Sequence, residues 1–243
     1  MQHPALESAN GHPELDRDAV HALLEEKFPT WQEVRSIPVM DNGEKLIDLC
    51  AAHGLAARVY ETQIRSSSGT RIFVRPGLAE RLREAQDWLK DQGLDCRLEV
   101  FYGYRSPAIQ QETFEKTRIQ MGLPEQMTDE QMERVHRFIA VPEIAGHPTG
   151  GAVDLTLIDD HTGSPLDMGT RPHAFEKESY TFSPFISRGA WINRQFLRAA
   201  MMSAGFAPFD GEWWHFSYGD REWAKYWNKS HAIYDQTSCP VPE

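Results

Sequence analysis

The chain has 243 residues, enough to bury a full hydrophobic core in one large domain or in two small ones. With 40% hydrophobic, 25% charged and 11% aromatic residues, its composition is that of an ordinary globular protein. The 36 acidic and 25 basic residues give a formal net charge of −11, which argues against nucleic acid or an anionic membrane as a partner.

Residues 1–39 are predicted to form an N-terminal extension that consists of a flexible tail and a helix. Residues 1–12 have the composition of the tail, and residues 13–28 carry leucine and valine side chains along one side of the expected helix. Beyond this extension, Asp41-Asn42-Gly43 predicts a turn and the run at 65–70 predicts a loop.

Proline, glycine and capping residues mark the starts and ends of the next helices. Pro76 suits the first turn of a helix, and Gly93 suits its end. Ser106 is an N-cap residue before a proline, and Thr128 resembles the start of a capping box. The predicted helices lie at 76–93, 107–120, 128–139 and 190–204.

Strand-forming residues cluster in three segments, at 96–104, 152–159 and 213–218. The second segment alternates between apolar side chains such as Val153 and polar ones such as Asp154, which indicates a strand with one buried face. Because helices and strands do not alternate regularly along the chain, an α+β fold is favoured over a doubly wound parallel sheet.

Neither a membrane span nor a secretory signal is visible. No stretch reaches the roughly 20 consecutive apolar residues that cross a bilayer, and residues 1–30 lack the basic start and apolar middle of a signal peptide. The three scattered cysteines, Cys50, Cys96 and Cys239, argue against a disulfide framework and against a cysteine-based metal site. We therefore expect a cytoplasmic protein without a membrane partner; the oligomeric state stays open.

His147 and Asp154 flank a turn that can bring them together. Seven residues apart on a straight strand they would face opposite sides, but Pro148 and the pair Gly150-Gly151 allow the chain to fold back between them. A carboxylate inside an otherwise apolar strand needs a partner, because burying it unpaired is costly. Metal ligation by Asp154 is one explanation, and a hydrogen bond to a turn is the other.

A second pair, Glu212 and His215, lies among large aromatic residues. Two histidines and one aspartate would leave a tetrahedral zinc ion with an open position for water, as in catalytic sites. Zinc lowers the pKa of such a water to near 7, and Glu212 could accept its proton while Trp213 and Trp214 keep the site dry. Taken alone, the segment also fits an exposed glutamate and a core histidine on a packing strand.

Arg105 follows an apolar strand at the point where a helix is predicted to begin. There its guanidinium could polarise a scissile carbonyl or neutralise an oxyanion, although a surface salt bridge explains it equally well. The other histidines with no partner at ligand spacing are expected to have structural or surface roles: His3, His12, His53, His136, His161 and His231.

These motifs occur in the same order in the zinc D-alanyl-D-alanine dipeptidases of the VanX type, which the sequence resembles over roughly residues 40–220. This family is grouped with the D,D-carboxypeptidases and the hedgehog-like domains in one zinc fold. The stretch at 75–89 also looks like the first core helix of the family. The matching motifs are Gly103-Tyr104-Arg105, His147 to Leu157, Thr162-Gly163 with Met168-Gly169, and Glu212 to His215.

The resemblance implies a single compact α+β domain with a central antiparallel sheet flanked by helices. We place this zinc peptidase domain at 40–235, followed by a C-terminal tail at 236–243. The resemblance also implies one Zn²⁺ per chain. Its ligands would be His147, Asp154 and His215, with Glu212 as the general base and Arg105 as the arginine that stabilises the transition state.

Two positions depart from the family pattern. Ala145 stands where the family has a serine two residues before the first ligand. His173 stands where family dipeptidases carry an acidic residue that helps to hold the free amine of the substrate. Together with Tyr104 and Trp214, His173 is a candidate for contact with the substrate.

The leading hypothesis is a zinc metallopeptidase that hydrolyses a D,D-dipeptide such as D-Ala-D-Ala. An alternative keeps the chemistry but changes the substrate to a longer or amine-blocked peptide, either in the cell wall or in a natural product. A third hypothesis is a non-catalytic zinc-binding module. In each enzyme hypothesis the partner is a small peptide and not a nucleic acid.

Overall fold

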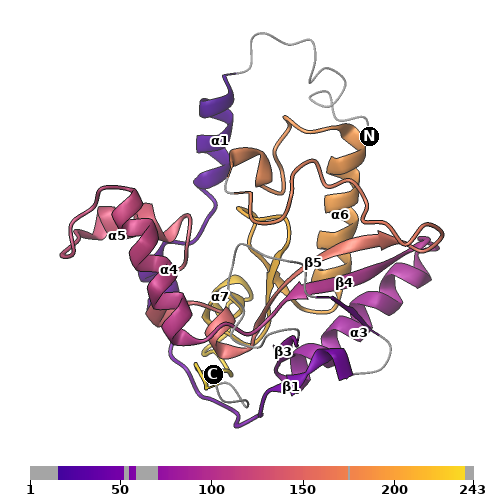
Figure 1. Cartoon of the computed structure of the whole chain (residues 1–243), viewed down its shortest axis with the longest axis horizontal. Coiled ribbons are helices and arrows are strands. Elements are labelled where there is room, and N and C mark those ends of the chain that lie inside the picture. Colours follow the sequence, from indigo (N-terminus) through magenta and orange to yellow (C-terminus); the bar gives the residue numbers. More distant parts are fainter. Residues whose placement is uncertain (1–15, 52–54, 59–70, 175, 239–243) are drawn as a thin grey trace.

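A computed structural model describes residues 16–51, 55–58, 71–174 and 176–238 (Figure 1). The expected tail at 1–12 and loop at 65–70 lie outside these ranges. None of the helices in the described ranges is long and apolar enough to cross a bilayer.

The fold is organised around a five-stranded sheet with the strand order β2-β4-β5-β7-β6 (Figure 1). The long strands β4 (Cys96–Tyr102) and β5 (Ala152–Asp159) pair antiparallel in its middle. The strand β7 (His215–Ser217) lies antiparallel between β5 and the short β6 (Ala207–Pro208). The expected α+β fold with a central antiparallel sheet is confirmed, with one parallel pair added at the edge, where β2 (Ala56–Ala57) joins β4.

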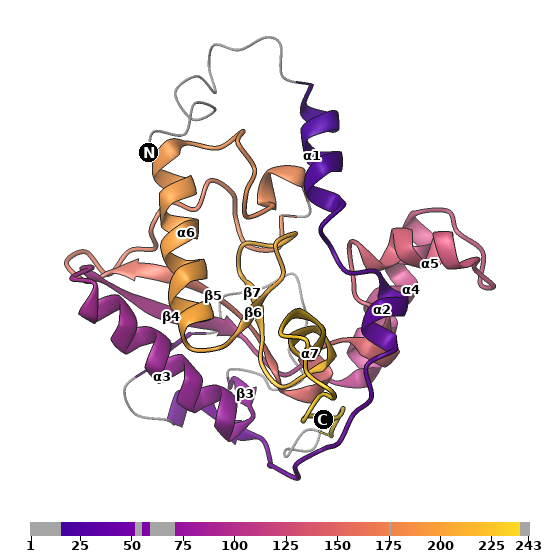
Figure 2. The same cartoon turned by 180° about the vertical axis from the view of Figure 1, so that it is seen from behind.

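Two long helices cover one face of this sheet. The helices α3 (Pro76–Asp91) and α6 (Arg188–Ser203) lie side by side in front of it in Figure 2. Val153, Leu155 and Leu157, alternate residues of β5, are buried in the main hydrophobic core together with side chains of both helices. The polar residues between them, Asp154 included, therefore face the opposite side of the sheet.

The helix starts agree with the capping residues. Pro76 begins α3, and the side chain of Ser106 caps α4 (Pro107–Gln120). Thr128 forms a capping box at the start of α5 (Asp129–His136). That helix was expected to run to residue 139, but it ends at His136 because the next residues turn, with Phe138 N–H donating to the Val135 carbonyl.

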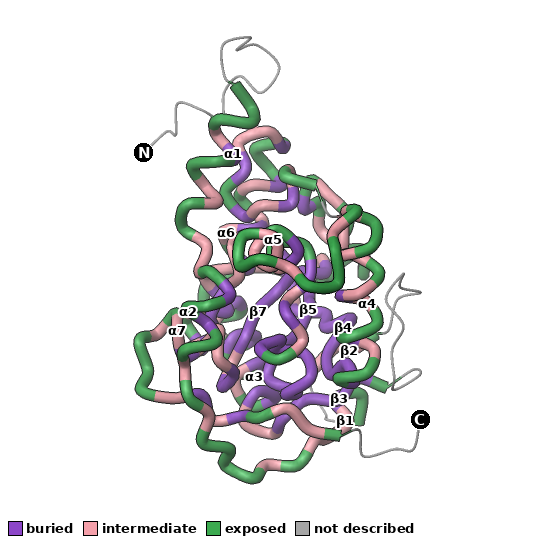
Figure 3. Tube along the Cα trace, turned by 90° about the vertical axis from the view of Figure 1, so that its left-hand side faces the viewer, coloured by how far each residue is buried: buried purple, intermediate pink, exposed green. Residues whose placement is uncertain are grey.

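The second group of helices packs beside the sheet. The helices α2 (Trp31–Arg35), α4 and α5 lie together on the side of the molecule away from α3 (Figures 1 and 2). Their contact is a separate hydrophobic cluster that includes Trp31, Val34, Phe114 and Val135. In Figure 3, α5 passes in front of the buried strands β5 and β7.

Several short elements differ from the predicted ones. The expected strand at 213–218 is shorter, because residues 212–214 form a turn in which His215 N–H donates to the Glu212 carbonyl. The first helix is also shorter than predicted. Strands of two residues and helices of one or two turns carry too little hydrophobic periodicity to be predicted from the sequence. The bounds are α1 (Arg17–Glu25), α7 (Arg221–Tyr226), β1 (Ile47–Asp48) and β3 (Phe73–Val74), the last two forming a separate antiparallel pair.

Arg75 joins segments that are far apart in the sequence. Its guanidinium is only 3% exposed and donates to the backbone carbonyls of Thr149 and Asp235, each at 2.7 Å, and to that of Glu44. It also pairs with the Asp41 carboxylate at 3.2 Å. Arg75 thereby ties the turn before β5 to the segment at 41–44 and to the C-terminal end of the described chain.

We expect Arg75→Ala to lower the free energy of unfolding by about 3 kcal/mol, because it removes a buried guanidinium that bonds to three backbone carbonyls, of which that of Thr149 is buried. The matched control is Lys90→Ala, which removes an exposed ion pair with Asp87 and should change stability by less than about 0.5 kcal/mol. Urea denaturation of both variants measures the difference, and equal midpoints would contradict this role of Arg75.

Candidate active site

The register of three strands places polar side chains next to one another on the face away from the main core. Asp154 of β5 pairs with His215 of β7, and on its other side it pairs with Tyr102 of β4. Directly paired residues point to the same face of a sheet, so the three side chains lie in a row. Asp154 is only 2% exposed in the middle of that row.

His147 reaches the same place from the turn before β5. It begins a single 3₁₀ turn (His147–Thr149), and Gly150 follows, whose φ of 72° reverses the chain without the strain that a side chain would add. The His147 Nδ1 lies 2.8 Å from the Gly103 carbonyl and donates to it, which turns Nε2 toward Asp154 Oδ1 at 3.5 Å. Gly146 is required beside it, because a Cβ there would collide with the Asp220 carboxylate.

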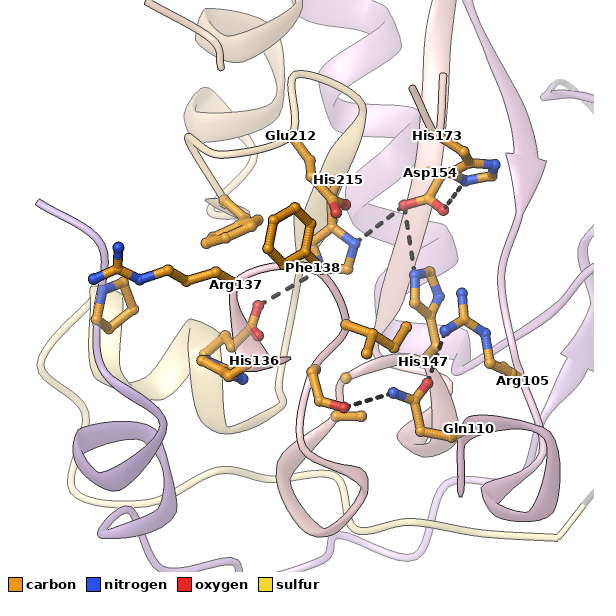
Figure 4. Close-up of a pocket in the computed structure, with 17 residues that line it drawn as sticks. Arg105, Gln110, His136, Arg137, Phe138, His147, Asp154, His173, Glu212 and His215 are labelled. Carbon is orange, nitrogen blue, oxygen red and sulfur yellow. Dashed lines mark hydrogen bonds and ion pairs between the residues drawn. The ribbon is translucent and has the colours of Figure 1, made fainter. Parts of the chain in front are cut away.

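Ligand atoms of His147, Asp154 and His215 all lie within 4.8 Å of one another, and all three residues are buried (Figure 4). The Nδ1 of His215 is 3.1 Å from Asp154 Oδ1. Two imidazole nitrogens and one carboxylate oxygen are a donor set for zinc that leaves a fourth position open. The structure thus brings the three predicted ligands together in a geometry that fits the metal.

Two of the three clustered residues, His147 and Asp154, are in the protonation state that a cation needs. Burial lowers the pKa of His147 to about 4, so its Nε2 keeps a lone pair. Although burial opposes ionisation, contacts with His147, His173 and His215 hold the pKa of Asp154 well below its usual value. Burial is likewise outweighed at His215, where Asp154 and Glu222 raise the pKa well above its usual value. A metal ion bound here would replace the His215 proton.

Glu212 enters the cavity beside this cluster from the turn before β7. Withdrawal from solvent raises its pKa to about 7, with the Asp154 carboxylate adding to the rise and His215 opposing it. Figure 4 shows Glu212 next to His215 and Asp154. A carboxylate with a raised proton affinity at this place can accept and return a proton.

Arg105 lies on the other side of the cluster and is held rigidly. Its side chain is buried, with Nε donating to the Tyr102 hydroxyl at 3.0 Å and Nη1 donating to Gln110 Oε1 at 2.8 Å. The amide of Gln110 in turn donates to the Ala140 carbonyl. A fixed guanidinium of this kind can stabilise negative charge that develops on a carbonyl oxygen.

The residues predicted to contact the substrate divide into two groups. His173 lines the cavity, but its Nε2 lies 2.9 Å from Asp154 Oδ2 and bonds to it. Tyr104 and Trp214 are fully buried and are not among the residues that line the cavity. The Tyr104 hydroxyl donates to the Thr237 carbonyl, and Trp214 lies edge-on to His173.

His136 and Glu222 also line the cavity, and no pattern in the sequence singles them out. His136, for which a structural or surface role was expected, lies at the end of α5. Glu222 lies at the start of α7, with its Oε2 3.6 Å from His215 Nε2. An acidic residue just after the Asp220 N-cap is typical of any helix start, so only the fold reveals its position beside His215.

The outer wall of the cavity includes part of the N-terminal extension. Pro29 lines it together with Arg137 and Phe138, which follow α5. Glu25 fixes this arrangement, because its carboxylate pairs with Arg137 at 2.7 Å and accepts from the Tyr180 hydroxyl at 2.8 Å. The extension that the sequence left without a role thus contributes to the site.

Residues 53–237 match the sequence model of the D-ala-D-ala dipeptidase family. The chain belongs to this family. A D-alanyl-D-alanine dipeptidase of Synechocystis is 34% identical over 224 residues, which cover 81% of this chain and 90% of the relative. Its Escherichia coli K12 counterpart is 40% identical over 72 residues, 30% of this chain and 37% of that protein. The structure described as VanYB in complex with D-Alanine-D-Alanine is 18% identical, with a TM-score of 0.38 and coverage of 70% of this chain and 86% of that one.

Family membership confirms the expected class of protein, a zinc metallopeptidase, and the expected zinc cofactor. The match covers each of the cavity residues predicted from the sequence. It begins after α1 and α2, so the part of the wall that contains Glu25 and Pro29 lies outside the matched region.

We expect the purified protein to bind one zinc ion per chain and His147→Ala to retain less than about a tenth of it after dialysis against a weak chelator, since one of three ligands is gone. Mass spectrometry of the metal content measures this. His161→Ala is the matched control, because this histidine is exposed and distant from the cluster. Full zinc content in His147→Ala would contradict the assignment.

Proposed function

We propose that the protein hydrolyses a D,D-dipeptide, with D-Ala-D-Ala as the first substrate to test. One observation carries the proposal: Glu212 and Arg105, from a turn and a strand end far apart in the sequence, line the same cavity as the buried metal-binding cluster. The names of the relatives from Synechocystis and Escherichia coli support this choice of substrate.

In the proposed mechanism, His147, Asp154 and His215 hold the zinc ion. When bound, zinc supplies the positive charge that acidifies a water molecule and polarises the peptide carbonyl. Glu212 accepts the proton of the attacking water and donates it to the leaving amine. Arg105 stabilises the negative charge on the carbonyl oxygen, and Tyr102 and Gln110 keep its guanidinium in place.

The position of the N-terminal extension favours a short substrate. Pro29 of this extension lines the cavity together with Arg137 and Phe138, and Glu25 of the same extension pairs with Arg137. A chain that continued beyond a dipeptide would have to pass this wall.

A second candidate keeps the chemistry but uses a longer or amine-blocked peptide. It is favoured by His173, because an imidazole that is bonded to Asp154 offers no carboxylate to a substrate amine.

The cytoplasm, expected from the sequence, stays the predicted location. There, a dipeptidase would intercept or salvage dipeptides used to build the cell wall.

Glu212→Gln should lower kcat/KM for D-Ala-D-Ala by about 10²–10⁴-fold, because the amide cannot accept a proton. Zinc content should not change, since Glu212 is not among the three clustered ligands. A coupled assay of released D-alanine gives the rate. Turnover equal to that of the parent protein would contradict the role of Glu212 as the base.

Free D-Ala-D-Ala should be hydrolysed at least about tenfold better, in kcat/KM, than its N-acetylated form or a longer peptide that ends in D-Ala-D-Ala, because one misplaced group costs roughly 1–3 kcal/mol in an enclosed site. Mass spectrometry of the products compares the three substrates on one enzyme preparation. A preference for either blocked peptide would favour the second candidate function.

A further inference from the structure

His173 adopts a backbone conformation that is unfavourable for a residue with a side chain. Its φ is 57°, and within the described residues only Asn228 shares a positive φ without being glycine. Such conformations persist where surrounding contacts determine them, often at functional sites. The contacts of the His173 side chain therefore indicate the function for which this backbone conformation is maintained.

The imidazole of His173 is fixed on several sides. Its side chain is 10% exposed, and Phe101, Tyr102 and Trp214 surround the ring edge-on, with ring centroids 5.7, 6.1 and 5.6 Å away. The only hydrogen bond that the described residues give this ring is the one to Asp154 Oδ2, at 2.9 Å (Figure 4). The aromatic side chains thus orient Nε2 toward that oxygen.

The two oxygens of Asp154 have different partners. Oδ1 faces His147 Nε2 at 3.5 Å and His215 Nδ1 at 3.1 Å, in the centre of the metal-binding cluster. Oδ2 points away from the centre and accepts the hydrogen bond of His173. The carboxylate can therefore offer one oxygen to a metal ion while the other is already engaged.

We propose that His173 is a positioning residue, which orients the Asp154 carboxylate so that Oδ1 alone faces the metal ion. This inference rests on the metal site in the proposed function. Each of the other two ligands also contacts a residue outside the cluster. His147 bonds to the Gly103 carbonyl, and His215 lies next to the Glu222 carboxylate. Outer partners of this kind fix ligand orientation and contribute to metal affinity.

Orientation of the Asp154 carboxylate, and not direct contact with the substrate, is then the main role of His173. While Nε2 donates to Asp154, it cannot accept a hydrogen bond from a substrate ammonium group. Nε2 therefore serves the metal centre, and Nδ1 is the one acceptor nitrogen that this ring retains.

The test measures zinc affinity by competition with a chromophoric chelator, in the absence of substrate. His173→Phe keeps an aromatic ring among its neighbours but removes the donor, and it should weaken zinc binding by about 10–100-fold. His173→Gln places an amide N–H near the position of Nε2 and should recover most of the affinity. The visible spectrum of the cobalt(II)-loaded protein should change in the first variant more than in the second.

His21→Phe is the matched control for the loss of a buried histidine. His21 is 2% exposed, lies edge-on to Tyr180 and Phe185, and contacts the Ser183 hydroxyl at 3.3 Å, away from the cavity. The zinc affinity of His21→Phe should stay within about twofold of that of the parent protein. Thermal unfolding of the metal-free variants shows whether each of them is folded.

Unchanged zinc affinity in His173→Phe would overturn the proposal, and so would a loss that His173→Gln does not recover. Both results are independent of hydrolysis. Failure to cleave D-Ala-D-Ala with intact zinc binding would instead contradict the proposed function and leave the role of His173 standing.

Discussion

The buried carboxylate of Asp154 is the group on which the site depends. A charge that is 2% exposed has to be compensated, and here imidazoles from three different segments surround it. His215 comes from the next strand, His147 from the turn before β5, and His173 from the loop after it. The same strand buries its alternate residues under α3 and α6, so the core that stabilises the fold also fixes the metal-binding face.

The sequence predicted the parts of the site that depend on local structure or on ordered motifs. The turn between His147 and Asp154 is visible in its proline and glycines, and the family motifs linked both residues to Glu212 and His215. The sequence could not predict partners that depend on packing between distant segments. Glu222 is an ordinary residue of a helix start until β7 and α7 meet, and His136 belongs to a helix whose end could not be located.

The same limit applies to the fold: its long elements could be predicted from the sequence, and its short ones could not. Long periodic segments such as α3 and β5 were recognised, whereas α2 and α7 contain too few residues for a hydrophobic period to show. The most consequential omission is the N-terminal extension, which carries no motif. Its Glu25 pairs with Arg137, which follows α5 and lines the cavity, and two charged side chains so far apart in the sequence do not reveal that they will meet.

X-ray absorption at the zinc edge is the sharpest test of the proposed ligands, because it reports which atoms surround the metal in the intact protein. With His147, Asp154 and His215 as ligands, the spectrum should show two imidazole nitrogens and one carboxylate oxygen from the chain, completed by oxygen from solvent, with no sulfur. A spectrum that shows sulfur, or fewer than two imidazoles, would mean that the cluster around Asp154 is not where the metal binds.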